Sequence, residues 1–244
     1  MAKTPYKSDA SNLHAGHRAR MKKRFITEGL DGFSDVQVLE LLLFYCMPQG
    51  DTNEIAHRLI NKFGSVSGVL DASPSQLIEC EGIGEHTATF ITALPALCRR
   101  YRMDKICTDN VFESKNKIER YLIACYMQAR SEYTVVLCLD NNRRLVNTVT
   151  LHEGSQTYNT SNTHRIAEIA MANNVRHIVL AHNHPSGICE PSEEDILSAG
   201  EMRVALELVG INLVEHYIIT SEQACGILEY TNEHGISYDT DGQM

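Results

Sequence analysis

The chain has 244 residues, of which 43% are hydrophobic, and this apolar content is enough to build folded cores and excludes disorder throughout. The longest uninterrupted apolar run, 41–47, is far shorter than the ~18 residues of a membrane-spanning helix. The first 25 residues are polar and basic, unlike a secretory signal. The eight cysteines form no Cys-x-x-Cys pair, which favours reduced thiols in a cytoplasmic protein without a membrane partner.

The net charge of −9 is unevenly distributed along the chain. Residues 1–110 contain 13 of the 22 basic and 13 of the 31 acidic residues, so residues 111–244 hold nine basic and 18 acidic ones. Such asymmetry favours two domains with different roles, joined in the polar stretch 103–110.

The first predicted domain, residues 1–103, shows helical patterns and no strand pattern. Helices are predicted over 17–28, 36–44, 52–62, 74–80 and 85–101. Ser34, Asp51 and Ser73 are suitable N-cap residues, and Pro74 fits the first helical position.

The second predicted domain, residues 111–231, alternates strands with helices, which predicts an α/β fold. Strands are predicted over 133–140, 144–151, 177–181 and 213–219, and helices over 111–130, 164–172 and 196–209. From Thr231 onward the sequence is polar, and we expect 232–244 to be a frayed tail.

A candidate metal site lies at the end of the predicted strand 177–181. His182 and His184 are two residues apart, so in an extended chain both imidazoles face the same side. Asp195 lies in the first turn of the following helix, which can bring its carboxylate over the strand end. Two imidazoles and one carboxylate suit Zn²⁺ and leave the fourth tetrahedral position for water, as in catalytic zinc sites.

Ser192 and Asp195 also have a purely structural interpretation. Ser-x-x-Asp before an apolar helical run is similar to a capping box, and taken alone the pair favours helix capping. The two roles are compatible, because a serine can cap a helix and still face a pocket. The coincidence of both histidines with this pair favours metal binding.

These motifs resemble a known family. His-x-His, seven residues and Ser-x-x-Asp form the signature of the JAMM zinc metallopeptidases, whose α/β domain is called JAB or MPN and is cytidine-deaminase-like. The segment 182–187, His-Asn-His-Pro-Ser-Gly, resembles the RadC-like (UPF0758) branch, once described as DNA repair proteins. The resemblance covers about 15–230, and 215–219 is similar to the family's Asp-His-x-Ile-Ile, with Glu215 in place of Asp.

The resemblance implies a role for each site residue. His182, His184 and Asp195 would hold Zn²⁺, Glu132 would be the general base, and Ser192 would donate a hydrogen bond to the oxyanion. The reaction would be hydrolysis of a peptide or isopeptide bond in a protein or peptide substrate. Glu153 competes with Glu132, which is preferred because it directly follows a helix and precedes a strand, as in the family. Other zinc chemistries fit worse, since neither His-Glu-x-x-His nor the deaminase signature occurs.

A second motif, in 77–88, has the form of a helix-hairpin-helix around Gly82-Ile83-Gly84. In such hairpins, backbone amides contact DNA phosphates without sequence specificity. Glu81 and Glu85 would repel a phosphate, whereas the basic residues in 99–102 would attract one or form an ordinary solvated surface. Two alternatives to the hydrolase follow. One is a DNA-binding protein of repair or processing with a structural or vestigial zinc site, and the other is a metal-dependent nuclease, for which the acidic domain is a poor electrostatic host.

Overall fold

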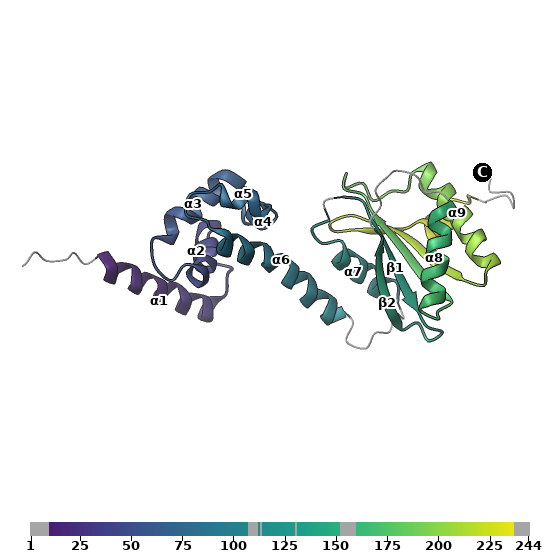
Figure 1. Ribbon diagram of the computed structural model, residues 1–244, viewed down its shortest axis with the longest axis horizontal. Helices are drawn as coiled ribbons and strands as arrows, with labels where there is room; N and C mark the ends of the chain where they lie inside the picture. Colours follow the sequence, from purple (N-terminus) through teal and green to yellow (C-terminus); the bar gives the residue numbers. More distant parts are fainter. Residues whose placement is uncertain (1–9, 107–111, 113, 130, 152–159, 237–244) are drawn as a thin grey trace, which may run out of the picture. The chain divides into compact units, whose positions relative to one another are not determined.

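The computed structural model in Figure 1 describes residues 10–106, 112, 114–129, 131–151 and 160–236. The chain forms two compact units, which divide between Cys98 and Arg99. The first unit is helical and the second combines a five-stranded sheet with helices. The predicted fold class, an α/β domain preceded by helices, is therefore confirmed.

The described residues of the first unit form five helices and the beginning of a sixth: α1 (Ala10–Glu28), α2 (Asp35–Cys46), α3 (Thr52–Phe63), α4 (Val66–Leu70), α5 (Pro74–Ile78) and α6 (Glu85–Ile106). The predicted N-caps Ser34, Asp51 and Ser73 all accept hydrogen bonds from the first turns of their helices. The short helix α4 was not predicted, because its five residues give too few turns for a periodic pattern. The predicted helices 17–28 and 85–101 were also shorter than the observed α1 and α6.

Part of the basic character of α1 is structural. The Arg18 guanidinium donates hydrogen bonds of 2.8 Å to the carbonyls of Met47, Pro48 and Gly50. Met47 is the C-cap of α2. Arg18 thus satisfies the C-cap carbonyl of α2 and two carbonyls of the loop that follows it.

The glycine turn between α5 and α6 is tightly packed. Gly82 has φ +94°, and a Cβ atom there would meet the Ile55 side chain at 2.8 Å, so both conformation and space require glycine. Ile83 is buried in the same apolar core. Arg58 donates to the Glu81 carbonyl at 3.1 Å and pairs with its exposed carboxylate at 3.5 Å. These contacts account for the turn as a packing element, and DNA contact by this hairpin remains a prediction.

The sheet of the second unit has the order β2-β1-β3-β4-β5. Its strands are β1 (Thr134–Leu139), β2 (Leu145–Leu151), β3 (His177–Asn183), β4 (Asn212–Ile219) and β5 (Ala224–Gly226). Only β3 and β4 are parallel, and the other neighbours are antiparallel. The four predicted strands are confirmed, and the short β5 was not predicted.

Helices cover both faces of the sheet (Figure 1). The helix α7 (Lys115–Cys125) packs on one face, against a cluster that includes Val135 and Leu137. On the other face, α8 (Thr160–Ala172), α9 (Glu193–Leu208) and α10 (Ile227–Glu233) pack against a cluster that includes Val136 and Cys138. Consecutive residues of β1 therefore face opposite cores, which explains why this strand is apolar throughout rather than alternating.

The predicted helix 111–130 was too long at both ends. Ser114 caps α7 through its side chain, and Phe112 lies outside the helix, with its N–H donating to the Arg143 carbonyl at 2.8 Å. At the other end Gln128 has φ 69°, which a helix does not allow. Residues 111, 113 and 130 lie outside the described residues.

The predicted frayed tail was wrong for its first residues. The helix α10 extends to Glu233, Thr231 is buried, and Ile236 packs against the core beside α8–α10. The pattern was missed because α10 is only two turns long and mostly polar on its outer side. Residues 237–244 lie outside the described residues.

Two other expectations concern the whole chain. None of the helices in the described part of the chain is both long and apolar enough to cross a membrane. The seven cysteines in the described residues are free thiols, consistent with the absence of a disulfide framework.

Candidate metal centre

The structure brings His182, His184 and Asp195 together at the carboxyl end of β3. His182 lies on the strand, and His184 follows it, held by a hydrogen bond from its N–H to the Ile219 carbonyl of β4 at 2.9 Å. The two Nε2 atoms are 3.1 Å apart. Asp195 Oδ1 lies 3.2 Å from His182 Nε2, and Asp195 Oδ2 lies 3.6 Å from His184 Nε2.

The first turn of α9 places Asp195. Ser192 is the N-cap, and its Oγ accepts a hydrogen bond from the Asp195 N–H at 3.1 Å. In return, Asp195 Oδ2 accepts from the Ser192 N–H at 2.9 Å and from its hydroxyl at 2.6 Å. The predicted capping box is confirmed, and the same carboxylate faces the histidines. The Asp195 side chain thus both completes the capping box and lies beside the two imidazoles.

The Asp195 carboxylate is charged despite its burial. Its exposed fraction is 8%, and burial alone would raise its pKa. Hydrogen bonds from His182 and from the hydroxyl and N–H of Ser192 outweigh this effect and hold the pKa below its ordinary value. The site therefore offers a carboxylate ready to bind a cation.

Both imidazoles are oriented through their other ring nitrogen. His184 Nδ1 lies 3.1 Å from the Ile188 carbonyl, which can only accept, so Nδ1 carries the proton and Nε2 keeps its lone pair. His182 Nδ1 lies 3.0 Å from His216 Nε2. Complete burial lowers the pKa of His216 well below its ordinary value, which keeps its ring neutral. Such outer contacts are typical of histidines that bind metals through the free nitrogen.

No role for His216 follows from the sequence motifs. It lies on β4 and is 1% exposed. The available signal was a histidine within a mostly apolar strand, but its contact with His182 depends on the parallel pairing of β3 with β4. Sequence alone did not specify that pairing.

Glu132 lies in the segment that leads into β1, and its side chain is exposed. The first residue of that strand, Thr134, pairs with His182. Glu132 is therefore near the carboxyl end of β3, where the histidines meet. Its competitor Glu153 lies outside the described residues.

The donor set fits a zinc ion. Among the described residues, the only group of histidine, cysteine or acidic side chains close enough to hold a metal together is His182, His184 and Asp195. Two imidazole nitrogens and one carboxylate oxygen are ligands that zinc prefers, and three protein ligands leave one position open. Cys189 is not in this group, and its thiol contacts the Ile218 carbonyl instead.

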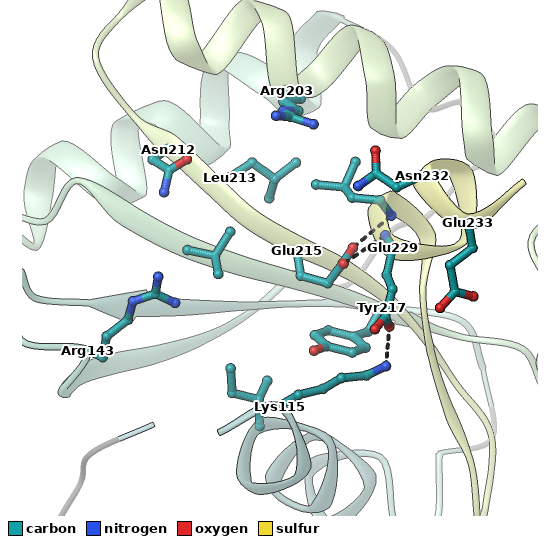
Figure 2. Close-up of a pocket in the computed structure, with 13 residues that line it drawn as sticks. Lys115, Arg143, Arg203, Asn212, Leu213, Glu215, Tyr217, Glu229, Asn232 and Glu233 are labelled. Atoms are coloured by element: carbon teal, nitrogen blue, oxygen red, sulfur yellow. Dashed lines mark hydrogen bonds and ion pairs between the residues drawn. The ribbon is translucent and has the colours of Figure 1, made fainter. Parts of the chain in front are cut away.

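A separate cavity of about 490 Å³ lies along β4 (Figure 2), and none of the histidines of the candidate metal centre lines it. Glu215, the residue that departs from the Asp of the resembling family, points from β4 to the start of α10. Its carboxylate accepts from the N–H groups of Leu228 and His216 at 2.8 Å and of Glu229 at 3.1 Å. Because the N-cap Gly226 has no side chain, Glu215 performs the capping of α10.

Comparisons with known proteins agree with this architecture. Residues 112–232 match the family model described as "RadC-like JAB domain". The chain is 32% identical over 225 residues to a UPF0758 protein of Fusobacterium nucleatum, covering 88% of this chain and 95% of the relative. It is 31% identical to a UPF0758 protein of Aromatoleum aromaticum, covering 83% of this chain and 90% of the relative. The chain therefore belongs to the UPF0758 family of proteins with a RadC-like JAB domain.

Proposed function

We propose that the chain is a zinc-dependent hydrolase of peptide or isopeptide bonds. The observation that carries this proposal is the convergence of two imidazole Nε2 atoms and the Asp195 carboxylate, with His184 Nδ1 and His182 Nδ1 already engaged by outer partners. A structural zinc site is normally closed by a fourth protein ligand, and this group has three.

Each side chain around the site would have a separate role in the reaction. A bound zinc ion would polarise a substrate carbonyl and lower the pKa of a water molecule to about 7. His182, His184 and Asp195 would hold the ion. Glu132, exposed beside the site, would accept a proton from the attacking water and deliver it to the leaving amine.

Ser192 has a constraint that the sequence did not reveal. Its hydroxyl has one proton, which is donated to Asp195 Oδ2 at 2.6 Å. To donate to the oxyanion of a tetrahedral intermediate, Ser192 would have to release this bond. The proposed donor role therefore requires the Ser192 hydroxyl to rotate when substrate binds, while its capping contact with the Asp195 N–H is kept.

The metal is tested first. Zinc per chain is measured by elemental analysis in the wild type, in His182→Ala and in the matched control His177→Ala, which removes a histidine from the other end of β3. We expect about one zinc per chain in the wild type and the control and a loss in His182→Ala. A wild type that binds no zinc under saturating conditions contradicts the proposal.

Hydrolysis is tested on the zinc-loaded protein. A library of quenched fluorescent peptides and isopeptide-linked substrates is screened with the wild type, Glu132→Gln and an exposed-acid control, Glu201→Gln. Loss of a proton acceptor of this kind typically lowers kcat about 10²–10⁴-fold. Zinc-dependent cleavage that is equal in Glu132→Gln and the wild type contradicts the assigned base.

A second candidate function is nucleic-acid binding, favoured by a cleft of about 350 Å³ between the end of α6 and α7. Three cationic side chains line it, together with one aromatic ring and three apolar residues: Arg102, Lys105, Arg120, Tyr101, Ile106, Ile123 and Ala124. Of the predicted basic residues, Arg99 instead donates to the Cys125 carbonyl and Arg100 pairs with Asp104. Cations and a ring suit phosphates and bases.

This second candidate is tested by fluorescence anisotropy with a labelled single-stranded oligonucleotide at several salt concentrations. Each lost phosphate contact reduces the steepness of the plot of log affinity against log salt concentration by about 0.7. We expect such a decrease for Arg120→Ala and none for the exposed control Arg165→Ala. Equal affinity losses in both variants, or no salt-sensitive binding by the wild type, count against it.

A further inference from the structure

Asn183 lies between the two histidines of the metal centre. Side chains alternate along a strand, so Asn183 faces the side of the sheet opposite to His182 and His184. It is 4% exposed and cannot reach solvent freely. A buried amide is costly unless both its donor and its acceptor are satisfied, so its partners explain why it is there.

Both partners of Asn183 belong to the segment that carries the proposed base. Asn183 Oδ1 accepts from the Tyr133 N–H at 3.1 Å, and Asn183 Nδ2 donates to the Ser131 carbonyl at 3.1 Å. These are the two residues on either side of Glu132. The amide therefore holds the backbone before and after Glu132, in the way that a neighbouring strand would hold it.

The orientation of this segment relative to the two faces of the sheet is also fixed. The Tyr133 ring packs with the α7-side core and stacks on Tyr126 at 4.6 Å between ring centroids. In the chain leading into β1, side chains alternate, so Glu132 lies on the face opposite to Tyr133. That is the face of Thr134, which pairs with His182. Because Asn183 holds the backbone in this orientation, the Glu132 side chain leaves the backbone on the face of the sheet where the histidines lie.

The chemistry of the contact also selects the residue type. A carboxylate in place of Asn183 would accept from Tyr133 but repel the Ser131 carbonyl, and an apolar side chain would leave both backbone groups unsatisfied. An amide is the side chain that offers a donor and an acceptor on one planar group. It therefore matches an N–H and a carbonyl from the same short segment.

We infer that Asn183 is a positioning residue, which links the histidine strand to the backbone of Glu132 and keeps the base in register with the metal centre. This inference rests on the proposed function. The proposed role of Asn183 is independent of metal binding, because its side chain faces away from the metal centre.

The inference is tested by spectroscopy on cobalt-loaded protein, which needs no substrate. The pH dependence of the visible cobalt absorption is measured for the wild type, Glu132→Gln, Asn183→Ala and the double variant. The control is Asn212→Ala, an asparagine at the far end of the sheet. Asn183→Leu is measured in parallel. Because it keeps the buried volume filled, it provides the test if Asn183→Ala fails to fold.

We expect Glu132→Gln to lower the midpoint of the absorption change by about 1 pH unit, since a nearby negative charge is removed. Asn183→Ala should move it in the same direction, the double variant should add nothing further, and cobalt affinity should stay within about threefold of the wild type. A midpoint unchanged in Asn183→Ala and Asn183→Leu while Glu132→Gln shifts it overturns the role of Asn183 alone. A wild type that binds no cobalt, or Glu132→Gln without effect, overturns the proposed function as well.

Discussion

The contact between Glu215 and α10 supplies the sharpest stability prediction. In Glu215→Ala, the start of α10 loses its capping carboxylate. Three N–H groups, those of Leu228, Glu229 and His216, lose their acceptor, and each buried donor left unsatisfied costs about 1 kcal/mol or more. We therefore expect Glu215→Ala to lower the free energy of unfolding by about 3 kcal/mol.

The assay is urea unfolding followed by circular dichroism, with calorimetry to identify the transition of the second unit. For a unit of this size, about 3 kcal/mol corresponds to a decrease in Tm of about 10 °C. Glu215→Gln keeps one acceptor oxygen and should lose only about 1 kcal/mol. The exposed-acid control Glu201→Ala should change stability by less than about 0.5 kcal/mol. A loss in Glu215→Ala no greater than in this control refutes the capping role.

Four further predictions follow from single contacts. Burial raises the pKa of Glu215, only partly offset by its backbone donors, so its stabilising contribution is full below about pH 4 and falls as pH rises through the raised pKa. Urea titrations of the wild type and Glu215→Gln should therefore differ most at acid pH, and a difference that grows toward neutral pH contradicts this sign. A Cβ in Gly226→Ala would lie 2.9 Å from the Glu215 carboxylate, and calorimetry should show a loss of about 1–3 kcal/mol. Ser192→Ala should cost about 1 kcal/mol in urea unfolding of the metal-free protein, while Ser192→Thr, which keeps both the N-cap acceptor and the hydroxyl donor to Asp195, should lose less; equal losses contradict the capping role. Gly82→Ala should destabilise only the first unit by at least about 1 kcal/mol, because it combines φ +94° with a close approach to Ile55; an unchanged first transition contradicts this.

Local patterns in the sequence were sufficient to predict most elements and the cluster of His182, His184 and Asp195. The strand 177–181, the spacing of His182 and His184, and the helix start at Ser192 are properties of a few consecutive residues. Each follows from periodicity or capping alone. The same reasoning was inaccurate for 111–130, where Ser114 and the positive φ of Gln128 limit the helix to Lys115–Cys125.

The sequence by itself determined which residue types gather at the end of β3, because the chain between His182 and Asp195 is short. Only the tertiary structure decided what lies behind them. His216 reaches His182 through parallel strand pairing, and Asn183 reaches the segment of Glu132 across 50 residues of sequence or more. Such contacts depend on which strands are neighbours and in which register. Those are global properties of the sheet, whereas periodicity and capping are local properties of the chain.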